Sequence, residues 1–127
     1  MKTSKKILIV EDEDSLQQAL NDALTRKGYK CVSAHDGEEG LRSALKQKPD
    51  LIMLDLVLPK MDGFEMLKKL RGDPWGRNAR VLILTNLSAD SSDRVRAAVE
   101  TYPEYYLVKS DWSIEDITKK TEEILSR

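Results

Sequence analysis

Five polar side chains each follow a short apolar run, and together they could act on one phosphoryl group. They are Glu11 and Asp12 after residues 7–10, Asp55 after residues 51–54, Thr85 after residues 81–84, and Lys109 after residues 105–108. Taken singly, each has an ordinary explanation, because acidic residues often precede helices and a lysine after a strand is usually solvated. The five residues together, at the ends of four apolar runs, predict one shared site.

We expect the three carboxylates to be buried or half-buried. Carboxylates that converge on one point in this way repel each other unless protons or a cation intervene, and Mg²⁺ is the hard cation that suits such oxygen ligands. The hydroxyl of Thr85 and the ammonium of Lys109 would add two groups that stabilise the charge of a transferring phosphoryl group. These residue types therefore predict a Mg²⁺ site in which Asp55 is the nucleophile and forms an aspartyl phosphate.

The apolar runs that precede these residues have the length of β-strands. Runs 7–10, 51–54, 81–84 and 105–108 are almost continuously apolar, and a weaker strand is expected at 29–34. Continuous apolarity, in place of alternation, is typical of parallel strands that are covered by helices on both faces.

Apolar residues at helical spacing predict a helix after each strand. The five sets are Leu16, Ala19, Leu20, Ala23 and Leu24; Leu41, Ala44 and Leu45; Phe64, Leu67 and Leu70; Val95, Ala98 and Val99; and Ile114, Ile117, Thr118, Thr121, Ile124 and Leu125. Helix ends are marked by Gly28, by Asp36 with Glu39, by Asp62, by the break at residues 72–74, and by Ser113 with Asp116. At the first of the capped starts, we expect the Asp36 side chain to cap the helix and the Glu39 side chain to return a hydrogen bond to Asp36.

Strand and helix alternate five times, which predicts an α/β fold with a doubly wound, five-stranded parallel sheet and flanking helices. The number of units is too small for an eight-stranded barrel. We expect one domain over residues 1–127, with its core at about 6–126. In such sheets ligands bind beyond the carboxyl ends of the strands, where the five polar side chains lie.

Composition excludes several classes of protein. With 21 Lys and Arg, 22 Asp and Glu and a net charge of −1, the chain has little general attraction to nucleic acid or to an anionic membrane. The basic start at residues 1–6 is followed by only four apolar residues, so we expect neither export nor membrane insertion. The chain has one cysteine, Cys31, and one histidine, His35, which excludes an intramolecular disulfide and a cysteine or multi-histidine metal site. The lack of a disulfide suits the reducing cytoplasm.

The sequence resembles the receiver domain of two-component response regulators. The resemblance covers the chain from Lys6 to the end of the last expected helix. It rests on the acidic pair Glu11-Asp12, on the D-x-x-x-P-x-x-D-G string of residues 55–63, on Leu84-Thr85, and on Val108-Lys109. It implies a flavodoxin-like fold with strand order 2-1-3-4-5.

The resemblance also implies a role for each matching residue. Asp55 would be the phosphoacceptor, and Thr85 and Lys109 would bind the phosphoryl group. Glu11, Asp12, Asp55 and the backbone carbonyl of Val57 would bind Mg²⁺.

Further positions would serve switching and loop geometry. Tyr106 matches an aromatic switch that turns inward when Thr85 moves, although ordinary strand packing is the alternative and Tyr105 could compete for the role. Pro59 and Gly63 are interpreted as loop-shaping residues.

Two positions depart from the family pattern. Asn86 stands where a small residue is usual, which would narrow access to the phosphoryl group. Ser110 replaces a proline, so the cis peptide bond usual there loses its basis, because a non-proline cis bond costs about 2.5–4 kcal/mol.

The resemblance implies a receiver that takes a phosphoryl group from a sensor histidine kinase or a histidine phosphotransfer protein. It would not be a turnover enzyme, and it would signal to a partner through the face formed by the fourth helix, fifth strand and fifth helix. Trp112 either contacts that partner or packs locally. Whether the chain stands alone or is one domain of a longer protein stays open.

Three alternative functions have less support in the sequence. A phosphorylation-independent scaffold is supported only by Asn86 and Ser110. An aspartate-nucleophile phosphatase would need a second carboxylate at the position of Val57. A flavin carrier is disfavoured because the acidic residues 11–14 would repel a phosphate.

Overall fold

The computed structural model describes residues 4–88 and 91–126. The strands are β1 (Lys6–Val10), β2 (Lys30–Ala34), β3 (Leu51–Leu54), β4 (Val81–Thr85) and β5 (Tyr105–Val108). The helices are α1 (Asp14–Arg26), α2 (Gly37–Gln47), α3 (Gly63–Gly72), α4 (Asp93–Val99) and α5 (Ile114–Leu125), with short 3-10 helices η1 (Gly76–Asn78) and η2 (Lys109–Asp111). Residues 1–3 and 127, which include part of the basic start and both ends of the expected domain, lie outside the described residues.

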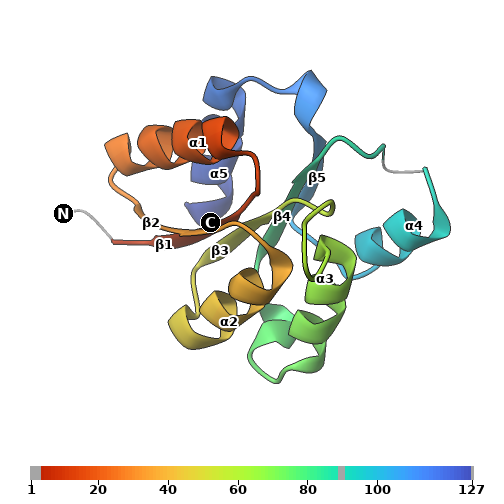
Figure 1. Ribbon diagram of the computed structural model, residues 1–127. Helices are drawn as coiled ribbons and strands as arrows, with labels where there is room; N and C mark the ends of the chain where they lie inside the picture. The colour runs from red at the N-terminus through yellow and green to blue at the C-terminus, as the bar shows by residue number, and fades with distance from the viewer. Residues whose placement is uncertain (1–3, 89–90, 127) are drawn as a thin grey trace.

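All five strands are parallel and lie in the order β2-β1-β3-β4-β5, which confirms the expected α/β fold. Helices α1 and α5 cover one face of the sheet, and α2, α3 and α4 cover the other (Figure 1). In the strand register Val10 is opposite Leu54 and Leu54 is opposite Ile83. The carboxyl ends of β1, β3 and β4 therefore meet at one edge of the sheet.

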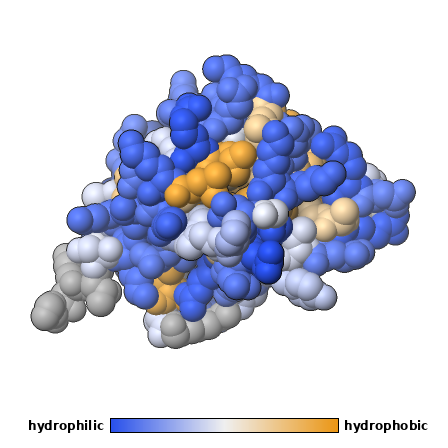
Figure 2. Space-filling view, turned by 90° about the horizontal axis from the view of Figure 1, so that it is seen from below, coloured by the Kyte–Doolittle hydropathy of each residue, from blue (hydrophilic) through white to orange (hydrophobic). Residues whose placement is uncertain are grey.

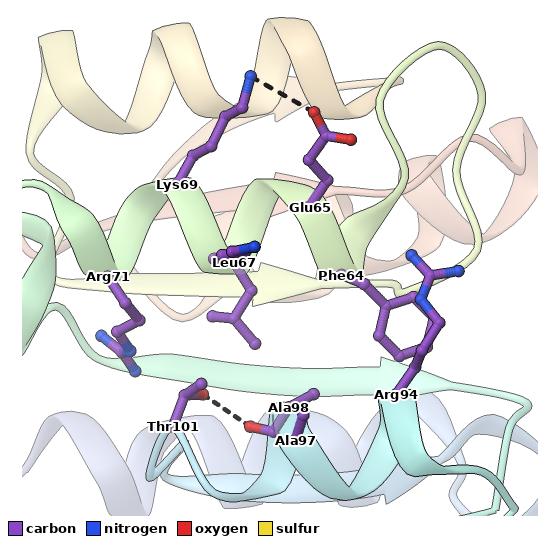
Figure 3. A pocket seen from close by; sticks show the side chains of 10 residues that line it. Phe64, Glu65, Leu67, Lys69, Arg71, Arg94, Ala97, Ala98 and Thr101 are labelled. Atoms are coloured by element: carbon purple, nitrogen blue, oxygen red, sulfur yellow. Dashed lines mark hydrogen bonds and ion pairs between the residues drawn. The ribbon is translucent and has the colours of Figure 1, made fainter.

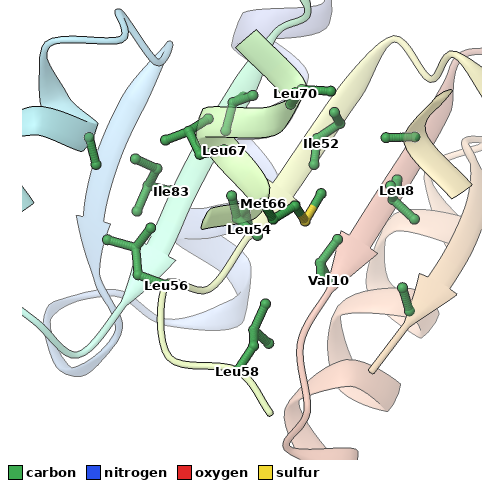
Figure 4. Close-up of a cluster of buried hydrophobic side chains, with 14 residues drawn as sticks. Leu8, Val10, Ile52, Leu54, Leu56, Leu58, Met66, Leu67, Leu70 and Ile83 are labelled. Carbon is green, nitrogen blue, oxygen red and sulfur yellow. The ribbon is translucent and has the colours of Figure 1, made fainter. Parts of the chain in front are cut away.

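The sheet separates two hydrophobic cores, because successive side chains of a strand point to opposite faces. In β1, Leu8 and Val10 join the core beneath α2 and α3, whereas Ile7 and Ile9 join the core beneath α1 and α5. Figure 4 shows the first of these cores, with side chains of β1, β3 and β4 packed beneath α3. Leu8, Ile52 and Leu54 are fully buried there. This two-sided burial explains why the strand sequences are continuously apolar.

The expected helix caps are present at three helices. The side chain of Asp36 accepts the N–H of Glu39 at 2.8 Å, that of Asp62 accepts the N–H of Glu65, and that of Ser113 accepts the N–H of Asp116. Glu39 was expected to return a hydrogen bond to Asp36. Its carboxylate instead accepts the N–H of His35 at 2.7 Å, because the side chain reaches one residue further back.

A few expectations about exposure and boundaries were wrong. Leu45 and Val99 were placed on buried helix faces, but 36% and 38% of their surfaces are exposed, because each lies at the margin of its apolar stripe. Tyr29 precedes β2 instead of starting it. Lys109 lies in η2, a turn of 3-10 helix that the sequence pattern did not indicate.

Within residues 4–88 and 91–126, no helix combines the length and the apolar composition needed to cross a bilayer. Seen from below, the surface is mostly hydrophilic, and its hydrophobic side chains form small patches among hydrophilic ones (Figure 2).

Candidate functional site

Three carboxylates meet at the carboxyl edge of the sheet. Glu11, Asp12 and Asp55 each offer one oxygen, and these oxygens lie within 4.8 Å of one another. Glu11 and Asp55 are only 2% and 5% exposed, whereas Asp12 is exposed. The sequence predicted at least partial burial for all three carboxylates. Asp12 is open to water because it lies in the loop that leads away from the sheet toward α1.

This arrangement suits a divalent cation. The ligand atoms are hard oxygens, two of them are held in the protein interior, and the exposed Asp12 leaves a path from solvent. Mg²⁺ retains several waters when it binds, so a site with one open side is appropriate for it. The donor set therefore fits the expected cofactor.

Lys109 joins the two buried carboxylates. Its Nζ atom is 2.7 Å from Oε1 of Glu11 and 2.9 Å from Oδ2 of Asp55. Burial works against the charged ammonium, but hydrogen bonds to Glu11 and Asp55 outweigh it, and the pKa of Lys109 is raised above its usual value. The lysine is therefore a positive charge held between the two buried carboxylates, Glu11 and Asp55.

Asp55 and Thr85 differ in how their polar atoms are satisfied. Oδ1 of Asp55 accepts the N–H of Val57 at 3.1 Å, and Oδ2 accepts a hydrogen bond from Lys109. Thr85 is fully buried, and its Oγ1 atom has no hydrogen-bond partner among the described residues. Leaving a buried hydroxyl unpaired has a cost, so such a group often marks a place where a ligand completes the bonding.

Tyr106 connects β5 to the loop that follows Thr85. Its hydroxyl donates a hydrogen bond to the carbonyl of Leu87 at 2.7 Å, and its half-buried ring packs against the core beneath α3. Burial and the charge of Asp55 raise the pKa of Tyr106. The neighbouring Tyr105 packs on the opposite face of the sheet, so the two tyrosines do not share one position.

Gly63 lets α3 begin directly against the backbone of Asp55. Its N–H donates to the carbonyl of Leu56 at 2.9 Å, and a Cβ atom added there would collide with the carbonyl oxygen of Asp55 and with Cα of Leu56. Pro59 is exposed in the same loop, and the next residue, Lys60, has a positive φ of 64°. The turn thus brings the chain back to the end of β3, where Asp55 lies.

Sequence reasoning missed Gln17, which is 4% exposed at the start of α1. Its amide nitrogen lies 3.0, 3.2 and 3.1 Å from the carbonyl oxygens of Ile9, Glu11 and Ala34. One side chain therefore joins α1 to the ends of β1 and β2, next to the acidic pair. The sequence does carry a signal for it, because Gln17 lies three positions before Leu20 and is therefore a polar residue beside the apolar stripe of the helix.

The residues that depart from the family pattern are at the surface. Asn86 and Ser110 are exposed, and no cis peptide bond occurs in the described part of the chain, which agrees with the expectation for Ser110. Trp112 is half-buried and packs locally against the core beneath α5, with Nζ of Lys120 at 5.9 Å from its ring.

Comparison with known proteins places the chain in a family. The chain matches the response regulator receiver domain over residues 7–122. It is 35% identical over 122 residues to the response regulator ArlR of Staphylococcus aureus, an alignment that covers 96% of this chain and 53% of that protein. The chain spans about half or less of the length of the curated relatives it matches.

Solved structures share the whole fold. The chemotaxis response regulator CheY4 of Vibrio cholerae superposes with a TM-score of 0.84 at 30% identity, covering 96% of this chain and 99% of that one. The receiver domain of the sensor histidine kinase PA1611 of Pseudomonas aeruginosa, described with a magnesium ion coordinated in its active-site cleft, gives a TM-score of 0.84 at 26% identity, covering 98% and 100% of the two chains. The family match covers residues 7–122 of this chain, and the solved structures share its fold. The chain therefore belongs to the response regulator receiver domains of two-component signalling.

Proposed function

We propose that the chain accepts a phosphoryl group on Asp55 from the phosphohistidine of a sensor histidine kinase or histidine phosphotransfer protein. Receiver domains are signalling domains and generally not turnover enzymes, so the expected product is a phosphorylated switch. The observation that carries this proposal is the position of the Asp55 carboxylate, buried beside Glu11 and hydrogen-bonded to Lys109.

In the transfer, an oxygen of Asp55 forms a bond to phosphorus as the phosphorus–nitrogen bond of the donor breaks. The electron pair of that bond stays on the imidazole nitrogen, which gains a proton from water. Lys109, which is already 2.9 Å from Asp55, would bind the negatively charged phosphoryl oxygens. Thr85 would donate its unpartnered buried hydroxyl to one of them.

Glu11, Asp12, Asp55 and the carbonyl of Val57 are the groups we assign to Mg²⁺. When bound, the ion would offset the repulsion between these carboxylates and the incoming phosphoryl group. Glu11 would hold its carboxylate in place through the N–H of Glu13, which it accepts at 2.9 Å.

The output would be a shift between two conformations of the segment after β4. If Thr85 moves toward the phosphoryl group, the loop that carries Leu87 moves with it. That movement strains or breaks the hydrogen bond from the Tyr106 hydroxyl. The face formed by α4, β5 and α5 would then present a changed surface to a downstream partner. Location in the cytoplasm and the lack of direct nucleic-acid binding stay predictions.

Incubation with Mg²⁺ and acetyl phosphate, read by intact mass, tests the proposal directly. We expect a labile gain of about 80 Da, the mass of an added HPO₃ group, that is absent without Mg²⁺ and absent in Asp55→Asn. Asp50→Asn, a change at an exposed aspartate outside the site, should leave the gain intact. Labelling that persists in Asp55→Asn, or an unlabelled wild-type chain, would contradict the proposal and favour a phosphorylation-independent scaffold.

A further inference from the structure

One ion pair joins α3 to α4. The carboxylate of Asp62 serves both helices, because Oδ1 accepts the N–H of Glu65 in α3 at 2.9 Å and Oδ2 accepts a hydrogen bond from Arg94 in α4 at 2.8 Å. The same guanidinium lies 4.3 Å from the centre of the Phe64 ring (Figure 3). Arg94 therefore holds α4 against two residues at the start of α3.

The start of α3 is itself fixed to the end of β3. Gly63, the residue between Asp62 and Phe64, lies so close to the backbone of Asp55 that no Cβ atom would fit there. Three apolar side chains further along α3 are also buried: Met66, Leu67 and Leu70. Asp62 is therefore anchored to the strand end that carries Asp55.

Helix α4 is held more loosely than α3. It has seven residues, of which Val95 and Ala98 are buried. A groove of about 750 Å³ lies between α3 and α4, and Leu67 and the exposed Ala97 are among the residues of its walls (Figure 3). Because this groove leaves the interface between the two helices incompletely packed, a shift of α4 against α3 requires little rearrangement of the core.

The phosphoryl transfer proposed above would move α4. Helix α4 follows β4 along the chain, so a movement of Thr85 toward a phosphoryl group on Asp55 would also displace the start of α4. A side-chain hydrogen bond of 2.8 Å is lost when its two atoms separate to about 3.6 Å. A shift of about 1 Å between α4 and the anchored Asp62 is therefore enough to break the bond from Arg94.

On the basis of the proposed function, we infer that the Asp62–Arg94 pair is a conformational latch. It keeps α4 beside the start of α3 and opposes the change that a phosphoryl group on Asp55 brings about. The pair is made in one conformation and lost in the other, and such a difference is what biases an equilibrium between conformations. Coupling is reciprocal, so loss of the pair should make an analogue of the phosphoryl group bind more tightly.

Beryllofluoride, which copies the shape and charge of a phosphoryl group on a carboxylate, tests the latch at equilibrium. The full chain is titrated in the presence of Mg²⁺, and the bound fraction is read by fluorine NMR. We expect the half-saturating concentration to fall about two- to fivefold in Arg94→Gln, the effect that an exposed ion pair supports. Arg94→Lys keeps the positive charge, so its value should lie between those of the wild type and Arg94→Gln.

Arg96→Gln is the matched control. Arg94 and Arg96 are both on α4, both side chains are 62% exposed, and each is 2.8 Å from a carboxylate oxygen. The partner of Arg96 is Asp93 of the same helix, so that bond survives a movement of α4 as a unit. Arg96→Gln should therefore leave the half-saturating concentration within about 1.5-fold of the wild type.

Asp62→Asn tests the latch from the side of α3. Asparagine keeps an oxygen for the cap but removes the charge that holds Arg94. We expect this variant to bind beryllofluoride more tightly as well. Arg94→Gln should add less in the Asp62→Asn background than in the wild type, because the two changes break one interaction.

The direction of the change separates a latch from a purely structural role. Damage to the fold would weaken beryllofluoride binding, whereas loss of the latch strengthens it. Unchanged or weaker binding in Arg94→Gln, or equal tightening in Arg96→Gln, would overturn the inference while the wild type still binds. A wild-type chain that neither binds beryllofluoride nor gains mass from acetyl phosphate would contradict the proposed function itself, and the latch would fall with it.

Discussion

Lys109 is the single positive charge held between two buried carboxylates, and its removal should be costly. In Lys109→Met, Glu11 and Asp55 lose the ammonium at 2.7 and 2.9 Å. We expect the free energy of unfolding without divalent cations to fall by about 3–5 kcal/mol, the usual cost of breaking a buried ion pair from one side. Added Mg²⁺ should restore more stability to this variant than to the wild type, because it replaces a lost positive charge.

Urea unfolding with a chelator and with Mg²⁺ measures both effects. Lys119→Met is the matched control, because Lys119 pairs with Glu115 at the surface, where both side chains are at least 70% exposed. Its stability should change little. Equal stability of Lys109→Met and the wild type would show that Lys109 does not hold the two carboxylates together.

Gln17 should influence metal binding without touching the metal. In Gln17→Leu, the three carbonyls of Ile9, Glu11 and Ala34 lose their shared donor, and the loop that carries the acidic pair is held less firmly. We expect Mg²⁺ affinity to fall about tenfold or more, the usual effect of removing a group that orients metal ligands.

Calorimetric titration with Mg²⁺ provides the measurement for Gln17. The neighbouring Gln18→Leu is the control, because Gln18 is exposed and its side chain bonds to Asp22 along its own helix. Unchanged affinity in Gln17→Leu, with the fold intact, would assign Gln17 to packing alone.

Asp62 links two helices and gives the fold a dependence on acid. It caps α3 by accepting the N–H of Glu65, and it accepts a hydrogen bond from Arg94 of α4. Burial raises the pKa of Asp62, but the N–H of Glu65 and the guanidinium of Arg94 outweigh it, so the pKa lies below the usual 3.8. A lowered pKa means that the ionised carboxylate stabilises the fold above about pH 3.8, and that this contribution is lost as the pH falls through the lowered pKa.

Comparison of Asp62→Asn and Asp62→Ala separates the two roles of this residue. Asparagine keeps an oxygen for the cap, whereas alanine removes it at a cost of about 0.5–2 kcal/mol. The stability difference between the wild type and Asp62→Asn should be present at neutral pH and vanish below the lowered pKa. Thermal unfolding across that range gives the result, and a difference that grows in acid would contradict the assignment.

Among the elements, the strands were predictable from sequence and the helix margins were not. Residues 51–54 and 105–108 coincide with β3 and β5, because strands buried on both faces leave an unbroken apolar run. Leu45 and Val99 were misjudged because helical spacing does not indicate how far a neighbouring element extends over a stripe. The 3-10 turn at Lys109 depends on local backbone geometry that no residue pattern marks.

The candidate site shows the same division. The types and order of Glu11, Asp12, Asp55, Thr85 and Lys109 placed them at one sheet edge because parallel strands end together. The bridge from Lys109 to both buried carboxylates depends on side-chain geometry, and so does the clamp made by Gln17. Those contacts join residues far apart in sequence, so spacing alone could not reveal them.

For the whole molecule, a functional metal site must stabilise the folded state. A ligand that binds only the folded chain adds about 2.7 kcal/mol at a concentration one hundred times its dissociation constant. We therefore expect the thermal midpoint to rise with Mg²⁺ concentration. Asp12→Asn should remove most of the rise, whereas Asp22→Asn, another exposed aspartate, should retain it. An equal rise in both variants would show that Mg²⁺ acts elsewhere.

The sheet backbone separates the two hydrophobic cores, so each core can accumulate substitutions separately during evolution. Ile7 and Ile9 face one core and Leu8 and Val10 the other, so substitutions beneath α1 and α5 meet a different set of packed side chains from those beneath α2 and α3. Energies of distant, unconnected changes add. Each helical face can therefore diverge toward new partners without compensating changes in the other, while the edge that carries Asp55 stays common to both.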